Sequence, residues 1–154
     1  MAWIFSLWGQ CRTHEEASAF AAHFERQRWL LADGTVTVCS TSLVAGTCCW
    51  VQPTSVSRAG ATDAKVAAQL TELGERLYER LRSAPSFLVA VVGVEVDDLR
   101  TEEELDALIR DSRRPYPGLV VATELWRRAG QPPHFETFRE GYVWVRYEGE
   151  RAPG

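Results

Sequence analysis

Lysine is almost missing from this sequence. Of the 17 lysine and arginine residues, only Lys65 is a lysine. The formal net charge is -4 over 154 residues. General nucleic-acid binders carry a basic surface, so this balance argues against direct nucleic-acid binding. The sequence contains six tryptophans. Arginine and tryptophan are both enriched at protein interfaces. A GC-rich genome and core packing would explain the same two enrichments without an interface.

Several functional motifs are also missing. The chain contains neither G-x-G-x-x-G nor G-x-x-x-x-G-K-[ST], the two glycine-rich phosphate loops, and no G-x-S-x-G for acyl transfer. No run reaches the roughly 18 apolar residues of a membrane helix. The apolar start lacks the basic region and the cleavage site of a secretory signal. We therefore expect a cytoplasmic protein without a membrane partner.

The four cysteines lack the C-x-x-C spacing of zinc and redox sites. Cys48 and Cys49 are adjacent, and adjacent side chains on a strand point to opposite faces of the sheet. The two thiols would therefore not share one metal ion. We predict that Cys11, Cys39, Cys48 and Cys49 are reduced core thiols, and we expect no metal and no cofactor.

Apolar periodicity predicts alternating strands and helices. A capping box, Thr13-x-x-Glu16, begins a helix whose helical spacing continues to Leu31. A second, longer helix begins at Thr62 or Asp63 and stops before Pro85. Two short helices begin at Thr101 and Thr123. The expected strands are residues 2–8, 36–40, 47–52, 87–94, 119–122 and 142–147.

These elements predict an α+β fold. The mixture of hairpin and crossover connections favours a mixed, mainly antiparallel sheet, with the two longer and two short helices packed mostly on one face. Residues 87–94 are apolar throughout, which is typical of a central strand covered on both sides. We expect one domain over residues 1–150 and a disordered tail over 151–154.

The strongest electrostatic feature is an acidic segment, residues 95–106. It contains seven acidic residues and only one basic residue, Arg100. Acids in the first turn of a helix complement the helix dipole, which explains residues 102–104. It does not explain Glu95, Asp97 and Asp98, which precede the helix. A negative face of this kind could meet a basic partner and steer its approach.

Trp126 and Arg127 form a second candidate contact patch, since tryptophan and arginine are frequent at binding hot spots. An amphipathic turn with solvated arginines would give the same pattern. Histidine offers little for catalysis. His134 lies two residues before Glu136, and His14 precedes Glu15, so each pair could act in acid-base chemistry. A loop histidine exposed to solvent is the simpler interpretation of His134.

The C-terminal part of the sequence, roughly residues 87–150, resembles a group of bacterial immunity proteins. These are encoded beside polymorphic toxins, some of which carry restriction-endonuclease-like nuclease domains. The resemblance rests on aromatic and glycine positions: Tyr116-Pro117-Gly118-Leu119, Glu124-Leu125-Trp126, Phe135, Phe138, Gly141-Tyr142-Val143-Trp144 and Tyr147-Glu148-Gly149-Glu150.

The resemblance implies a protein that binds a cognate toxin, with nucleases among the candidates, and neutralises it by stoichiometric inhibition. No catalytic residue is expected. The predicted contact residues are Asp97, Asp98, Glu102, Glu103, Asp106, Trp126 and Arg127. Two alternatives remain at this point: a small enzyme that uses His134 or His14, and a structural subunit that associates through its aromatic face. The sequence leaves the oligomeric state open.

Overall fold

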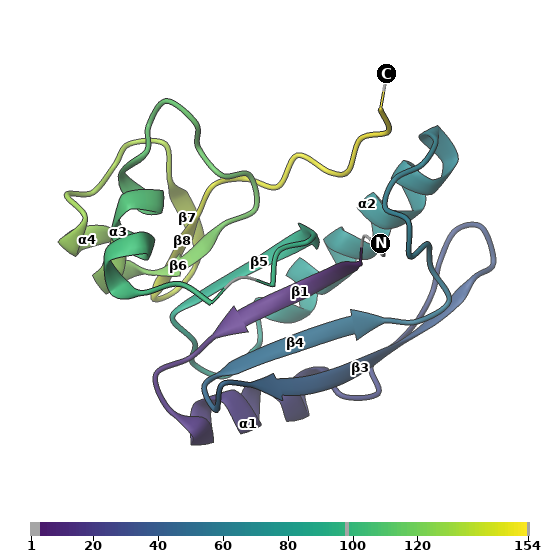
Figure 1. Cartoon of the computed structure of the whole chain (residues 1–154), viewed down its shortest axis with the longest axis horizontal. Coiled ribbons are helices and arrows are strands. Elements are labelled where there is room, and N and C mark those ends of the chain that lie inside the picture. The colour runs from purple at the N-terminus through teal and green to yellow at the C-terminus, as the bar shows by residue number, and fades with distance from the viewer. Residues whose placement is uncertain (1–3, 98, 154) are drawn as a thin grey trace.

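A computed structural model describes residues 4–97 and 99–153. Its strands form one open sheet of eight strands in the order β2-β3-β4-β1-β5-β6-β8-β7 (Figure 1). All strand pairs in the described part of the chain are antiparallel. The strands are β1 (Phe5–Gln10), β2 (Arg28–Leu30), β3 (Val36–Val44), β4 (Cys48–Pro53), β5 (Val89–Val94), β6 (Val120–Ala122), β7 (Glu136–Arg139) and β8 (Tyr142–Trp144).

Four helices complete an α+β fold, as predicted: α1 (His14–Phe24), α2 (Ala64–Leu81), α3 (Glu102–Arg110) and α4 (Thr123–Arg128). The N-termini of α1, α2 and α3 are where the capping residues predict them, whereas α4 begins at Thr123 without a side-chain cap. The Thr13 hydroxyl accepts a hydrogen bond from the Glu16 amide, and the Asp63 carboxylate accepts one from the Val66 amide. Thr101 begins α3 with the predicted capping box.

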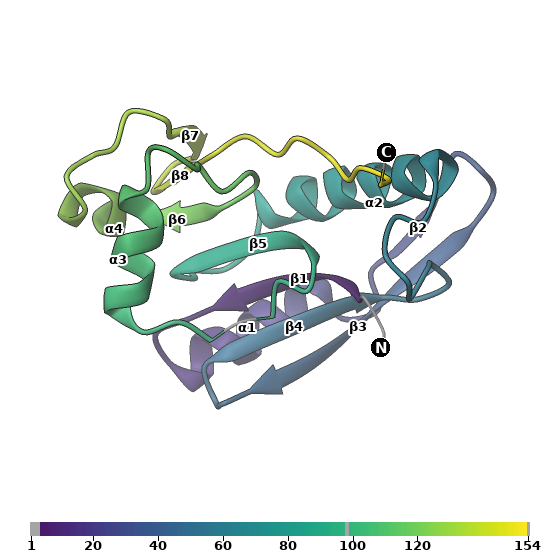
Figure 2. The ribbon, with the colours of Figure 1, turned by 45° about the horizontal axis from the view of Figure 1, so that its top comes forward.

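The two longer helices share one face of the sheet, and α3 lies on the other (Figures 1 and 2). Phe20 of α1 and Leu77 of α2 belong to the core that also contains Leu7 of β1. Leu105 of α3 packs with Val121 of β6 in a second core. The expectation of one shared face therefore holds for α1 and α2. The strand alternation leaves Val121 on the opposite face, which α3 covers.

The first helix ends earlier than its periodicity predicts, at Phe24 and not near Leu31. The chain reverses at Arg26, whose φ is +62°. The Arg26 amide then donates to the Cys39 carbonyl at 3.0 Å, and the Cys39 amide donates to the Gln27 carbonyl at 2.8 Å. Pairing with β3 therefore outcompetes continuation of the helix and adds β2 to the sheet edge. Leu31 is buried, but in a turn and not on a helix.

The segment after β8 docks on α2 (Figure 2). The Glu150 amide donates to the Thr71 hydroxyl at 2.8 Å, and the Tyr147 hydroxyl donates to the Glu150 carboxylate at 2.7 Å. Gly74 makes this contact possible, because a Cβ there would collide with the Tyr147 ring. The chain is therefore anchored as far as Glu150, the residue at which the predicted domain ends.

Candidate functional site

The first half of the acidic segment crosses the sheet as a strap, which we define as residues 95–100. The strap starts where β5 ends and reaches the opposite end of β1, where the Gln10 side chain donates to the Arg100 carbonyl at 2.9 Å and accepts from the Arg100 amide at 3.3 Å. Val96 is buried against Trp8 of β1. Asp97 is exposed. Asp98 lies outside the described residues. Glu95 and Asp97 therefore lie on a segment whose far end is held to β1 through Arg100 and Gln10.

The second half of the acidic segment begins α3. Glu104 is used in the capping box, where its carboxylate accepts from the Thr101 amide at 3.2 Å. Asp106 accepts from the Arg110 guanidinium at 2.6 Å. Glu102 and Glu103 point into solvent, and the Glu102 side chain is 86% exposed. Glu102 and Glu103 are therefore accessible to a partner, although the Glu102 carboxylate lies 3.9 Å from Arg128, and Asp106 is already paired with Arg110.

A cleft of about 340 Å³ lies between α3, α4 and the chain that joins β1 to α1. Its apolar lining includes Leu88, Leu105, Ile109 and Leu125. Its size is at the lower end of the range for ligand pockets. The cleft brings the α3 acids next to residues from two other elements, which the linear sequence keeps far apart.

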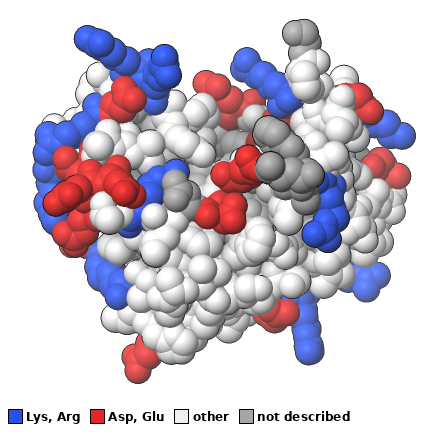
Figure 3. Space-filling model, in the orientation of Figure 1, with Lys and Arg blue, Asp and Glu red and all other residues white. Residues whose placement is uncertain are grey.

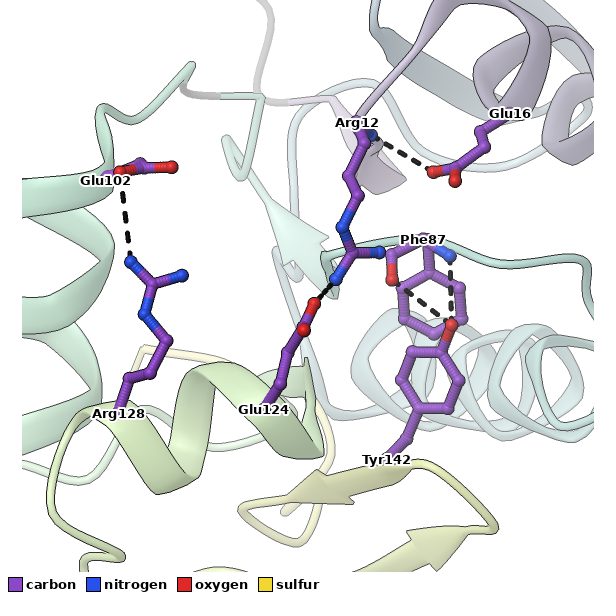
Figure 4. Close-up of polar contacts among 7 residues, drawn as sticks. All are labelled: Arg12, Glu16, Phe87, Glu102, Glu124, Arg128 and Tyr142. Carbon is purple, nitrogen blue, oxygen red and sulfur yellow. Dashed lines mark hydrogen bonds and ion pairs between the residues drawn. The ribbon is translucent and has the colours of Figure 1, made fainter.

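Two ion pairs border this cleft (Figure 4). Arg12 pairs with Glu124 of α4. Arg128 of α4 lies 3.9 Å from the Glu102 carboxylate of α3. All four side chains are substantially exposed, and exposed pairs contribute about 0–1 kcal/mol. An incoming charged group could displace either pair at little cost. Sequence reasoning missed Arg12 and Glu124 as site residues, because no local pattern links them.

Helix α4 separates the acidic residues of α3 from the predicted patch of Trp126 and Arg127. Glu124, Leu125 and Arg128 face the cleft beside α3. Trp126 and Arg127 instead line a shallow groove with β7 and β8. The Trp126 indole donates to the Pro132 carbonyl at 2.9 Å, which fixes the ring against the Pro-rich loop. The structure therefore does not bring the acidic residues and the Trp126 patch together into one surface.

The histidines predicted as alternative catalytic groups have structural neighbours. His14 Nδ1 lies 3.0 Å from the Gly46 carbonyl oxygen, where it joins α1 to the β3–β4 turn. Glu136 is paired with Arg146 at 3.1 Å. His134 is half-buried and packs on Phe135, with ring centroids 4.8 Å apart. Among the described contacts, neither histidine has a carboxylate partner.

The four cysteines are buried and free. Burial raises the pKa of Cys11, Cys39 and Cys49 to about 12, and it also raises the pKa of Cys48. These thiols are therefore protonated at neutral pH, and the thiolate is the nucleophilic form. In the described part of the chain, no three His, Cys, Asp or Glu side chains are arranged to hold a metal ion.

No family model, no curated protein and no solved structure matches this chain. Within residues 4–97 and 99–153, none of the helices combines the length and apolar character needed to cross a bilayer. The function is therefore inferred from the chain's own surfaces, together with the resemblance noted in its C-terminal part.

Proposed function

We propose that this chain is an immunity protein, which binds a cognate bacterial toxin in the cytoplasm and neutralises it by stoichiometric inhibition. The observation that carries the proposal is the exposed acidic surface formed by the strap and the first turn of α3, led by Asp97, Glu102 and Glu103. The resemblance of the C-terminal part to immunity proteins supplies the biological class.

An acidic surface suits a toxin with a basic active site. Enzymes that process nucleic acids bind the phosphate backbone through lysine and arginine, so a nuclease is the toxin class that fits best. Opposite charges accelerate encounter and suppress association with wrong partners. The acids lie on a capped helix and on a strap anchored by Gln10, so little conformational order must be gained on binding. We assign Asp106, which is paired with Arg110, to the edge of the proposed contact, and Trp126 with Arg127 remains a separate predicted patch.

The first test is rescue of growth. The chain is co-expressed with the product of the neighbouring gene, and a one-to-one complex of the purified proteins is sought by sedimentation. The expected result is a protein that is toxic alone and harmless in the complex. Absence of both rescue and complex would refute the proposed function.

The second test asks whether the acidic surface makes the contact. Replacing Glu102 and Glu103 with lysine should weaken binding at least tenfold at low salt, because a basic partner would meet two cations. The matched control replaces Glu75 and Glu79 with lysine. Both control residues are exposed on α2, and the charge change is identical. Equal affinities of the two variants would remove α3 from the interface.

A further inference from the structure

One face of β3 and β4 is free of charge. Along these strands Ser42 lies opposite Trp50 and Val44 lies opposite Cys48, all on the face away from α1. Every residue that points to this face from β1, β3 and β4 is uncharged: Ser6, Trp8, Gln10, Val36, Val38, Ser40, Ser42, Val44, Cys48, Trp50 and Gln52. On the edge strand β2, Arg28 lies opposite Val38. Figure 3 shows the result as a broad area without Lys, Arg, Asp or Glu, bordered by both acidic and basic side chains.

The strap covers only the inner part of this face. Val96 packs on Trp8, which is 3% exposed. Farther out, no helix of the described chain lies over this face of β3 and β4, because α1 packs on the opposite face (Figure 1). Trp50 is half-buried there, Ser42 is exposed and Val44 is 37% exposed. We call this outer area the open sheet face, defined by Ser40, Ser42, Val44, Trp50 and Gln52.

The open sheet face shares two features with the centre of a protein interface, the absence of charged side chains and the presence of a tryptophan, while Ser40, Ser42 and Gln52 make it partly polar. Such centres are poor in charge, rich in aromatic side chains and surrounded by a polar rim. Trp50 supplies the aromatic ring, and its indole Nε1 is covered without an acceptor in the described chain. The rim on the strap side carries the acids Glu95 and Asp97. Elsewhere on the rim, Arg58 lines a groove together with Ser40 and Gln52.

The rim also selects the occupant. A second copy of this chain would bring two straps, and two molecules of net charge -4, toward each other. A partner with an apolar patch that carries lysine or arginine on the side facing the strap would instead meet complementary charge at Glu95 and Asp97. We propose that the open sheet face, anchored on Trp50, is where the basic toxin docks. This inference rests on the proposed function and names the surface through which it acts.

The test measures affinity in the complex of this chain with the product of the neighbouring gene. Trp50→Ala should weaken binding by about 30-fold or more, as expected for a tryptophan hot spot. Ser42→Arg should weaken it by roughly tenfold or more, because it places a cation and bulk before a basic partner. Ser42 is exposed on a strand, so this variant is expected to keep the fold. Ala22→Arg, exposed on α1 on the opposite side of the sheet, is the control and should change affinity less than about twofold.

The outcomes separate the two proposals. Loss of affinity with Ser42→Arg and Trp50→Ala, but not with Ala22→Arg, supports docking on the open sheet face. A complex that forms with unchanged affinity in the folded Ser42→Arg variant overturns this inference and leaves the proposed function standing. If the chain forms a dimer and Ser42→Arg dissociates that dimer, a second copy covers the open sheet face, and this result also overturns the inference. No complex with the neighbouring protein overturns both.

Discussion

The Tyr78 hydroxyl occupies a position in the core where the sheet ladder would otherwise be broken. β6 pairs with β5 only at Val89 and Ala90. Beyond that point the Val92 amide donates to the Tyr78 hydroxyl at 3.0 Å, and the hydroxyl donates to the Gly118 carbonyl at 2.7 Å. One side-chain oxygen therefore replaces the missing strand partner for both backbone groups.

Tyr78→Phe should accordingly cost about 2–4 kcal/mol of unfolding free energy. The substitution leaves a buried amide and a buried carbonyl without partners, at about 1–3 kcal/mol each. Urea unfolding followed by tryptophan fluorescence measures this cost. A loss below about 0.5 kcal/mol for Tyr78→Phe would mean that water replaces the hydroxyl.

Glu150 gives the stability of the fold a pH dependence of unusual sign. Burial raises its pKa above the ordinary 4.5, although the hydrogen bond from Tyr147 acts in the opposite direction. The native state therefore holds its proton to higher pH than the unfolded state. The free energy of unfolding should fall as pH rises from 4.5 through the raised pKa of the folded state.

Glu150→Gln tests this linkage because the amide keeps an acceptor for Tyr147 but cannot ionise. The variant should gain stability relative to the wild type between pH 4.5 and pH 7, with the gain complete above the folded-state pKa. Urea unfolding at several pH values measures the difference. A constant difference across this range would show that Glu150 is not protonated preferentially in the native state.

At the scale of elements, local sequence signals predicted a helix start wherever a single capping residue determines it. The caps at Thr13, Asp63 and Thr101 placed three helix starts, because each side chain bonds an amide only three residues away. The end of α1 and the short strands β2 and β7 were not predicted. Arg26 leaves the helix to pair with Cys39, and β7 exists through its pairing with β8. Such long-range pairings leave no periodic signal in three or four residues.

The candidate site divides in the same way. The acids of the strap and of α3 were visible as a run in the sequence. The ion pairs Arg12–Glu124 and Arg128–Glu102 were not, because each joins elements that meet only in the folded sheet. The open sheet face was hidden for a related reason. Successive side chains on a strand point to opposite faces of the sheet, and only the folded structure determines which of the two faces a helix covers.

The contact between the C-terminal segment and α2 depends on one glycine. In an exposed helix, Gly→Ala gains about 1 kcal/mol from helix propensity. Gly74 is buried, and a Cβ there would overlap the Tyr147 ring. We therefore expect Gly74→Ala to displace residues 147–150 and to lower the free energy of unfolding by about 1–3 kcal/mol, the usual cost of overpacking.

Hydrogen exchange at the Glu150 amide reports this displacement directly, because that amide donates to Thr71 of the same helix. Its protection should fall in Gly74→Ala while the amides of β1 and β5 keep theirs. Ala68→Gly, exposed on the same helix, controls for a change in propensity alone. Unchanged protection at Glu150 would show that Tyr147 can move aside without releasing the segment.

For the whole molecule, the acidic surface and the open sheet face should have separable effects on the kinetics of binding. Exposed charges act over about 10 Å at 0.1 M salt and steer the encounter. A packed apolar contact acts after the encounter and sets the lifetime of the complex. The same distinction follows from the geometry, since Glu102 and Glu103 extend into solvent and Trp50 lies half-buried in the sheet.

Rapid-mixing kinetics with the neighbouring-gene protein at several ionic strengths should resolve the two contributions. The association rate of the wild type should fall at least tenfold between 0.05 and 0.5 M salt, as is typical of electrostatic steering. Lysine at positions 102 and 103 should lower the rate at low salt and flatten its salt dependence. Trp50→Ala should leave the salt dependence intact and raise the dissociation rate by about 30-fold. If Trp50→Ala instead changed only the association rate, the indole would act in the encounter and not in the packed contact. The assignment of the open sheet face as the centre of the interface would then be wrong.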